Sequence, residues 1–588
     1  MVSRRVALVL CATALLGTLF GTPLMTGLGA ASPSSGLDGS GATAERSQPT
    51  AEADGLRCPQ PIDATETDDG PRIVELYPNP TAHGNVGEYL VVEIPSETDL
   101  ENWSLSDGHT TAGLPNETVS GRIALTTDPE ETRELTDDPV GELEGTVRLA
   151  ADGDDLELRN GSRTIDTVAY DRAPTAERWY RTAETDGSEP TDETPGSGEW
   201  WPRGATCLPS STVDTDEATT FVLPDNPDVP QETIREADDR LLLAGYTFTD
   251  EDVAADLVAA ADRGVDVAVL LESGPVGGTP AATESVVETL ERGGVDVRFV
   301  GGEGARYRFH HPKYAVADES VLVTSENWKP AGVGGESSRG WGVRLADDAL
   351  ADELAAIFRA DFGGWDAESG ASFREDASFV EDDAAPPREF PTNHGAETVS
   401  VDAAELLLAP ENAEPRLLEL LDGADDEILI KQASIADDVS LLEATLDAAR
   451  RGVDVRILLD SSWYVEDEHE TLAADLERTA DEEELSLEAE LAEDTDAFEK
   501  IHAKGIVIDR EVAVVGSANW NENSLQNNRE VLLALHGTDA AAYYADVFES
   551  DRDEDDAWSL PFELSAAVVA ALVVAAVVGH RYVRFGSE

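Results

Sequence analysis

Lysine is nearly absent from this chain. Only five of the 588 residues are lysine, whereas aspartate and glutamate together number 121, and the formal net charge at pH 7 is −80. Such an unbalanced charge repels itself unless it is screened, and in molar salt the Debye length falls to ~3 Å. Because the acidic residues are spread along the whole chain, the composition favours a halophilic protein over one with a single acidic patch. It also makes nucleic acid a less favoured partner, since no basic stripe is visible.

Cysteine is scarce as well. Of three cysteines, Cys11 lies in the N-terminal apolar segment, which leaves Cys58 and Cys207. In an oxidising exterior these two can form a disulfide that closes a loop of about 150 residues and contributes about 5 kcal/mol. Two unpaired buried thiols are the alternative. No histidine, cysteine or carboxylate cluster has metal-ligand spacing, so neither a metal nor another cofactor is expected.

Both ends of the chain carry apolar segments. Residues 1–31 combine Arg4 and Arg5, an apolar run and small residues, which predicts a signal peptide, with a retained anchor as the alternative. Residues 564–583 contain "LSAAVVAALVVAAVVG" between the acidic "DRDEDD" and a basic tail, which predicts a transmembrane helix with the tail in the cytoplasm. We therefore expect a single-pass protein of the cell membrane with its ectodomain outside. A cleaved tail would leave it secreted or surface-attached.

Three polar stretches, 32–69, 176–211 and 366–400, are rich in Gly, Pro, Ser and acidic residues and predict linkers. Between the first two, residues 70–175 form short alternating runs separated by turn signals, the pattern of a β-sandwich. The runs "IVELYPNP", "GEYLVVEI", "WSLSD" and "DTVAYD" resemble the lamin tail domain, an immunoglobulin-like fold. This resemblance implies a binding or spacer module with an unknown ligand and no catalytic residues.

The remainder of the chain contains an internal repeat. "AAADRGVDVAVLLES" at 259–273 returns as "DAARRGVDVRILLDS" at 447–461, and each copy runs from a helix end into a buried strand. The change from helical to continuous apolar periodicity is typical of a β-α-β unit. We therefore predict a duplicated α/β domain with halves at 212–365 and 401–552.

Each half then carries the same polar motif. The residues are His311, Lys313, Asp318, Ser325 and Asn327 in the first half, and His502, Lys504, Asp509, Ser517 and Asn519 in the second. Two His-x-Lys-x4-Asp motifs in register, each followed by Ser-x-Asn, resemble the phospholipase D superfamily. With the acidic composition, the chain resembles a haloarchaeal member. The resemblance implies a duplicated α/β phospholipase D fold in which two similar halves form one active site.

The residue types suit phosphoryl chemistry. Histidine and lysine two places apart on a strand project from the same face. One imidazole can attack phosphorus and become a phosphohistidine, while the other protonates the leaving oxygen and later activates water. The lysines and asparagines supply charge and hydrogen-bond donors to the phosphoryl oxygens. The aspartates, at strand ends, are expected to be structural, and the serines either bond phosphate or shape the turn. Lys329 and Lys431 are candidates for the cleft rim, and Trp328 and Trp520 for packing.

The two motifs are not equally complete. Glu530, 28 residues after His502, matches the acidic residue that orients the histidine in this family. Arg339 stands 28 residues after His311, and Glu336 is a nearby candidate to replace the missing acid. The competence of the first half and the identity of the nucleophile therefore stay open.

The leading hypothesis is an extracellular, membrane-tethered phosphodiesterase that hydrolyses phospholipid phosphodiester bonds. One alternative is a nuclease that acts on extracellular nucleic acid by the same mechanism. A second alternative is a non-catalytic surface adhesin in which the duplicated domain is a scaffold.

Overall fold

The computed structural model describes residues 70–553 except 81–85, 134, 137, 182–197, 207, 209, 303–304, 382–387 and 493–494. The predicted signal peptide, the acidic stretch 32–69, the apolar segment 564–583 and both partners of the predicted disulfide, Cys58 and Cys207, lie outside the described residues. Within the described part of the chain, no helix combines the length and apolar character needed to cross a membrane.

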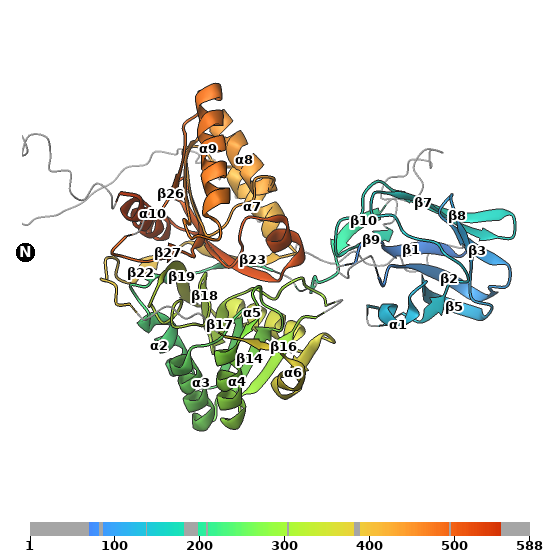
Figure 1. The fold of residues 1–588 in the computed structure, drawn as a ribbon, viewed down its shortest axis with the longest axis horizontal. Coiled ribbons are helices and arrows are strands. Elements are labelled where there is room, and N and C mark those ends of the chain that lie inside the picture. Colours follow the sequence, from blue (N-terminus) through green and yellow to red (C-terminus); the bar gives the residue numbers. More distant parts are fainter. Residues whose placement is uncertain are drawn as a thin grey trace, which may run out of the picture. The chain divides into compact units, whose positions relative to one another are not determined.

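The first described region contains two β-sheets (Figure 1). One has the order β10-β9-β1-β2-β5-β6, with β1 Arg72–Tyr77, β2 Tyr89–Asp99, β5 Thr118–Thr126, β6 Val140–Glu142, β9 Glu177–Arg181 and β10 Gly198–Pro202. The other has the order β4-β3-β7-β8, with β3 Trp103–Ser106, β4 Thr111–Gly113, β7 Asp154–Asn160 and β8 Arg163–Tyr170; a short helix, α1, spans Pro129–Thr132. Leu76 and Leu90 of the first sheet share one core with Leu105 and Leu158 of the second. This region is therefore a β-sandwich, while its immunoglobulin-like and lamin-tail character stays a prediction.

The rest of the described chain forms two α/β halves, each built on a mixed sheet. The first sheet has the order β20-β16-β14-β13-β17-β18-β19-β12-β22, and the second has the order β11-β23-β30-β29-β28-β24-β25-β26. The strands of the first are β12 Glu217–Leu223, β13 Arg240–Gly245, β14 Asp266–Glu272, β16 Asp296–Val300, β17 Tyr314–Ala317, β18 Ser320–Thr324, β19 Ser338–Ala346, β20 Ala367–Ser369 and β22 Glu397–Ser400. Those of the second are β11 Thr212–Asp214, β23 Ala403–Ala409, β24 Glu427–Gln432, β25 Asp454–Leu459, β26 Leu487–Leu491, β28 Lys504–Ile508, β29 Val512–Gly516 and β30 Glu530–His536; β27 Lys500–Ile501 pairs with β19.

The internal repeat marks the same helix-to-strand turn in both halves. Helix α3 (Glu251–Arg263) ends at Gly264, which has φ 99°, and β14 follows. Helix α8 (Ser440–Arg451) ends at Gly452, which has φ 104°, and β25 follows. Glycine adopts this left-handed conformation without a steric penalty, so it closes each helix and turns the chain into a buried parallel strand. The predicted β-α-β units are therefore present in both halves.

Helices cover the outer face of each sheet (Figure 1). The first half uses α2 Asp228–Glu236, α3 and α4 Ala281–Arg292, and the second uses α7 Ala413–Asp422, α8 and α9 Glu466–Glu483. Besides the core under the outer helices of each half, a further core joins the two halves. It includes Val343 and Leu533 from the two sheets, Leu354 of α5 (Asp348–Phe362) and Tyr544 of α10 (Thr538–Asp553). The two halves are thus packed through one continuous apolar core.

The halves also exchange edge strands. Strand β11, at the start of the first half in sequence, pairs with β23 of the second. Strand β22, which precedes the second half, pairs with β12 of the first. Strand β22 belongs to the stretch 366–400 that the sequence suggested was a linker, and this stretch also holds β20, α6 Gly370–Asp376 and β21 Phe379–Val380, which pairs with β15 Thr279–Pro280. The sheet of each half therefore contains one edge strand that lies at or just before the start of the other half in sequence: β11 in the second sheet and β22 in the first.

Candidate active site

The two His-x-Lys motifs lie at equivalent places in the two sheets. His311 and Lys313 lead into β17, while His502 stands between β27 and β28 and Lys504 begins β28. The Nζ of Lys504 donates a hydrogen bond to the carbonyl of His502 at 2.7 Å, and Lys313 makes the same bond to His311. Each lysine is therefore fixed beside the histidine of its own half.

Each histidine is anchored to the other half through its backbone. The N–H of His311 donates to the carbonyl of Arg529 at 3.0 Å, and the N–H of His502 donates to the carbonyl of Arg339 at 2.9 Å. These reciprocal bonds relate the halves by a pseudo-twofold axis. They also bring both histidines to the surface where the halves meet.

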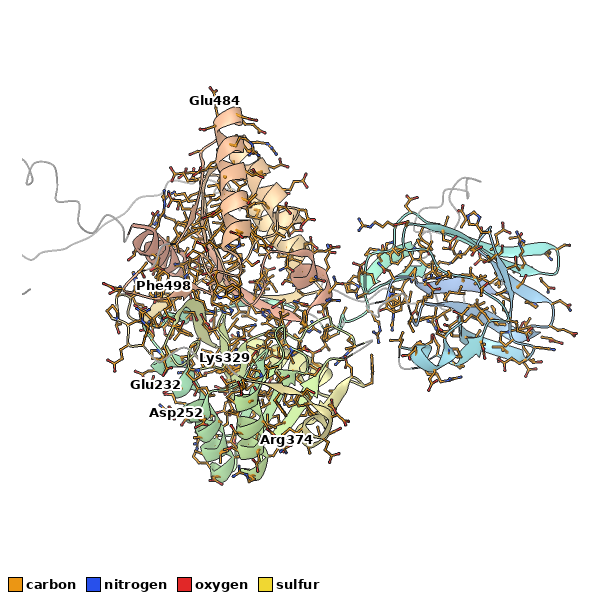
Figure 2. The ribbon with its side chains drawn as sticks, viewed as in Figure 1. Glu232, Asp252, Lys329, Arg374, Glu484 and Phe498 are labelled. Carbon is orange, nitrogen blue, oxygen red and sulfur yellow. The ribbon has the colours of Figure 1, made fainter. Side chains whose placement is uncertain are left out.

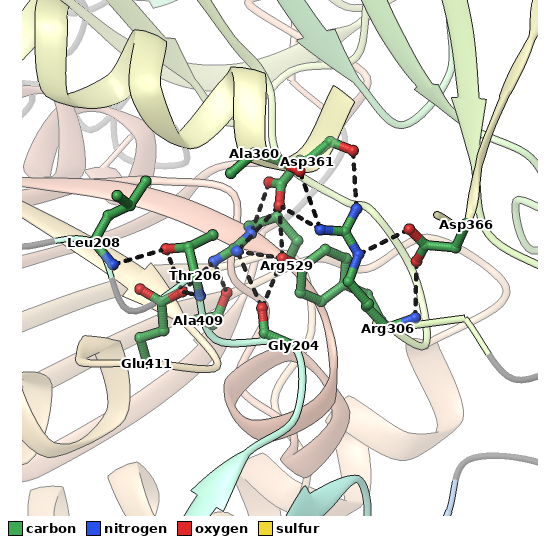
Figure 3. Close-up of polar contacts among 11 residues, drawn as sticks. Gly204, Thr206, Leu208, Arg306, Ala360, Asp361, Asp366, Ala409, Glu411 and Arg529 are labelled. Carbon is green, nitrogen blue, oxygen red and sulfur yellow. Dashed lines mark hydrogen bonds and ion pairs between the residues drawn. The ribbon is translucent and has the colours of Figure 1, made fainter. Parts of the chain in front are cut away.

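The side chains of the two arginines are buried ion-pair anchors. Arg529 is fully buried and its Nε lies 2.9 Å from Oδ2 of Asp361, near the end of α5 (Figure 3). Arg339 is also fully buried, and its Nε lies 2.9 Å from Oδ2 of Asp551, in the last turn of α10. The side chain of each arginine therefore forms an ion pair with an aspartate of the other half, and its backbone carbonyl accepts a hydrogen bond from the N–H of a histidine of that half. Arg339 occupies the position at which the spacing of the other motif indicates an acidic residue, and it is a structural anchor between the halves.

A carboxylate from the opposite half meets each histidine. Nδ1 of His311 lies 2.9 Å from both carboxylate oxygens of Glu530. Glu530 also accepts hydrogen bonds from Ser517 at 2.6 Å and Asn528 at 3.0 Å. Nδ1 of His502 lies 3.3 Å from Oε2 of Glu326. A carboxylate hydrogen-bonded to Nδ1, as Glu530 is to His311, fixes the imidazole tautomer and leaves Nε2 for chemistry, the arrangement seen in catalytic triads; the Glu326–His502 contact has the ion-pair distance without hydrogen-bond geometry.

The sequence did not identify Glu326 as a site residue. Glu336, the acid considered for this place, lines the mouth of the cavity described below, and no contact between it and His502 is seen in the described residues. Glu326 lies between the serine and asparagine of its own Ser-x-Asn motif, where the second half has Ala518. This difference between the two Ser-x-Asn motifs was the one feature of the sequence that could have identified Glu326 as a site residue.

Burial governs the ionisation of the histidines and lysines. It lowers the pKa of His311 to about 4 and of His502 to about 3, although Glu530 and Glu326 act in the opposite direction. Burial also lowers the pKa of Lys504 to about 8 and holds that of Lys313 well below its ordinary value. Burial therefore favours the neutral imidazole, the form needed in the nucleophile, while the carboxylate beside each ring favours the imidazolium that is needed in the acid.

The two carboxylates that contact the histidines, Glu530 and Glu326, also have lowered pKa values, although burial acts to raise them. Burial raises the pKa of Glu530, but its interactions with His311, Lys313 and Ser517 outweigh burial and hold the pKa below its ordinary value. The pKa of Glu326 is lowered in the same way by His502 and Lys504. Both carboxylates are consequently ionised and favour an imidazolium when one forms.

The asparagines and serines of the motifs have different surroundings. The amide oxygens of Asn327 and Asn519 are buried without a hydrogen-bond partner among the residues that the structure describes, so these amides keep bonding capacity for a ligand. Ser325 accepts a hydrogen bond from the N–H of Trp341, and Ser517 accepts one from Val531. The serines therefore hold neighbouring strands together.

The two aspartates of the motifs lie away from the histidines, at the β17–β18 and β28–β29 turns. The carboxylate of Asp318 accepts hydrogen bonds from the N–H groups of residues 238, 239 and 240. That of Asp509 accepts from residues 425, 426 and 427. Both aspartates tie a sheet turn to the start of the adjacent strand.

A cavity of about 890 Å³ opens beside the second histidine, with His502, Asn327, Lys329, Lys500, Arg388 and Tyr464 on its wall. Figure 2 shows Lys329 where the two halves meet. Lys329 and Lys500, with the two lysines of the motifs, account for four of the chain's five lysines. Lys329, Lys500 and Arg388 bring positive charge to a wall that also holds Glu326, Glu336 and Glu499, so an anionic ligand meets cations here in a strongly acidic chain.

The remaining candidates are structural. Lys431 is fully buried and paired with Asp551, not on the cleft rim. Trp328 and Trp520 are buried, and Trp328 donates from its indole to the carbonyl of Ala244 at 2.9 Å. His310 is buried, and its N–H donates to Glu272 at 2.7 Å. In the described part of the chain, no group of histidine, cysteine and carboxylate side chains could hold a metal ion.

Comparison with known proteins agrees with this geometry. Residues 231–362 and 417–552 each match the model of the cardiolipin synthase PLD-like domain. A cardiolipin synthase of Listeria welshimeri is 28% identical over 172 residues, which cover 28% of this chain and 33% of that protein. Cardiolipin synthase B of Escherichia coli is 25% identical over 330 residues, which cover 52% of this chain and 72% of that protein. The chain thus matches about a third of the length of the Listeria relative.

Solved structures give a weaker likeness. Phosphatidylserine synthase of Haemophilus influenzae is 14% identical with a TM-score of 0.44, and the match covers 59% of this chain and 88% of that one. Nuc of Salmonella typhimurium, a phospholipase D family member, is 20% identical with a TM-score of 0.23 and covers 27% of this chain and 98% of that one. Residues 231–362 and 417–552 are thus similar to the cardiolipin synthase PLD-like domain, and each carries one of the paired motifs.

Proposed function

We propose that this protein is a phosphodiesterase that cleaves phospholipid phosphodiester bonds through a phosphohistidine intermediate. One observation carries the proposal: two histidines, one from each half, each have Nδ1 against a buried carboxylate of the other half. This pairing supports a site built from both halves and argues against a non-catalytic scaffold.

The chemistry divides between the two imidazoles. Nε2 of one histidine attacks phosphorus, the bond from phosphorus to the leaving oxygen breaks, and the second histidine, as imidazolium, gives that oxygen its proton. The second histidine, now neutral, takes a proton from water, whose oxygen attacks phosphorus and breaks the phosphorus–nitrogen bond. Lys313, Lys504, Asn327 and Asn519 stabilise the phosphoryl oxygens as charge develops.

Phospholipid is the preferred substrate class for two reasons. The curated relatives are named cardiolipin synthases. The predicted helix at 564–583, with its ectodomain outside, would hold the site at a membrane surface. The same proposal includes export by the predicted signal peptide, a halophilic origin and a lamin-tail-like sandwich that binds an unidentified ligand.

The test incubates purified protein in molar NaCl with vesicles of diether phosphatidylglycerol and a primary alcohol. The alcohol can replace water in the second step, so a phosphatidyl-alcohol product is expected that is lost in His502→Ala. Activity should persist in EDTA, since the steps above use no cation. Single-stranded DNA in parallel should stay intact; its cleavage with untouched lipid would support a nuclease, and inertness toward both would favour an adhesin.

A further inference from the structure

Backbone hydrogen bonds define which residues of the two halves are equivalent. Ser325 donates from its N–H to the carbonyl of Trp341 at 2.9 Å, and Trp341 donates back to Oγ of Ser325 at 3.0 Å. Ser517 and Val531 make the same reciprocal pair, at 3.1 Å in both directions. Trp341 therefore corresponds to Val531. The residues one place earlier on these strands also correspond.

This equivalence matches Gly340 with Glu530, and Glu326 with Ala518. Each half thus has one glutamate and one small residue at the same two neighbouring positions, but in exchanged order. In the second half the carboxylate comes from the strand that follows the motif. In the first half it comes from the Ser-x-Asn turn.

The two positions of the first half compete for one volume. A Cβ atom added at Gly340 would lie 2.3 Å from Cγ and 2.6 Å from Oε1 of Glu326. Real Cβ atoms do not approach other heavy atoms so closely, so a side chain at 340 and the present Glu326 exclude each other. Gly340 has no left-handed φ, so its backbone would accept a larger residue once Glu326 is gone.

Glu326 has few other partners. It is 2% exposed, and its Oε1 has no hydrogen-bond partner among the described residues. Glu530 by contrast divides its oxygens among His311, Ser517 and Asn528. The Glu326 carboxylate lies 3.3 Å from Nδ1 of His502 and also interacts with Lys504 and with the hydroxyl of Ser338.

We infer that Glu326 is the positioning residue for His502, a carboxylate displaced to the neighbouring turn, with Gly340 providing the space for it. Both halves of the site are then complete despite the arginine at 339. The inference rests on the proposed phosphodiesterase function.

The experiment transfers the carboxylate from position 326 to position 340, the counterpart of Glu530. Initial rates with bis(4-nitrophenyl) phosphate are compared for wild type, Glu326→Ala, Glu326→Gln, Gly340→Glu and the double variant Glu326→Ala/Gly340→Glu. We expect each single variant to lose about 10⁴-fold in kcat, by analogy with replacement of the triad aspartate. The double variant should be at least about tenfold more active than either single variant, because a carboxylate again faces His502. Glu319→Gln, on an exposed turn of the same half, is the matched control and should keep the wild-type rate.

A double variant no better than the worse single one, or wild-type activity in Glu326→Gln, would overturn the inference. Glu326→Gln nearly preserves shape, so it serves if Glu326→Ala fails to fold. A wild type inactive on every phosphodiester would refute the proposed function instead. The crystal structure of the double variant would still decide the inference: the introduced carboxylate should lie within about 3.5 Å of Nδ1 of His502, and a side chain directed elsewhere would refute it.

Discussion

At the scale of single residues, the site depends on keeping cations and neutral imidazoles together in a buried place. Burial lowers the pKa of both Lys313 and Lys504; the charge of Lys504 lowers that of Lys313 further, and the charge of Lys500 lowers that of Lys504 further. A lysine is a compact point charge whose pKa shifts on burial, whereas arginine stays charged. This difference explains why a chain that otherwise uses arginine keeps lysine at these two positions.

The lowered pKa of Lys504 predicts an alkaline limit on activity. Lys504 loses its charge as pH rises through about 8, and the donor to the phosphoryl oxygens weakens with it. We expect kcat/KM to decline with a midpoint near pH 8, while circular dichroism over the same range stays unchanged. A midpoint at about 10.4, the ordinary lysine value, would contradict this account.

At the scale of elements, the aspartates of the motifs are predicted to act on stability and not on chemistry. Asp509 accepts hydrogen bonds from three consecutive N–H groups and itself has φ 52°. Asp509→Ala removes both acceptor oxygens and all three hydrogen bonds, so the free energy of unfolding should fall by about 1–3 kcal/mol in urea denaturation. The folded variant should keep kcat within about threefold. A large loss of kcat at unchanged stability would give Asp509 a chemical role.

The elements also show what the sequence could and could not supply. The Arg-Gly-Val-Asp-Val repeat predicted a helix end followed by a buried strand. Both copies have that structure, because a glycine that adopts a left-handed φ ends a helix through local backbone geometry alone. Glu326 was missed because counting 28 residues from His311 leads to Arg339, one place before the true counterpart of Glu530. Only cross-strand hydrogen bonds reveal that offset. Strands β11 and β22 are too short to leave a periodic pattern, and they form because a distant edge strand pairs with them.

At the scale of the whole molecule, buried ion pairs and exchanged strands bind the halves into one unit. Removing one member of a buried pair leaves an uncompensated charge, which costs about 3–5 kcal/mol. Asp361→Asn removes the carboxylate that Arg529 meets across the halves but leaves Glu411 at 3.1 Å, so it should lower the free energy of unfolding by about 3 kcal/mol, the lower end of that range. The control Arg292→Met breaks the exposed pair with Glu288 and should cost less than about 1 kcal/mol. Equal effects of the two variants would mean that the buried pair does not hold the halves together.

The central claim is that His311 and His502 belong to one catalytic site. The decisive measurement is turnover of one phosphodiester by His311→Ala, His502→Ala and the double variant under identical conditions, with folding checked by circular dichroism. Residues that act as a unit are not additive, so each single variant should lose nearly all activity and the double variant should be little worse than the worse single one. Losses that multiply, or substantial turnover in either single variant, would mean two independent sites and would contradict the claim.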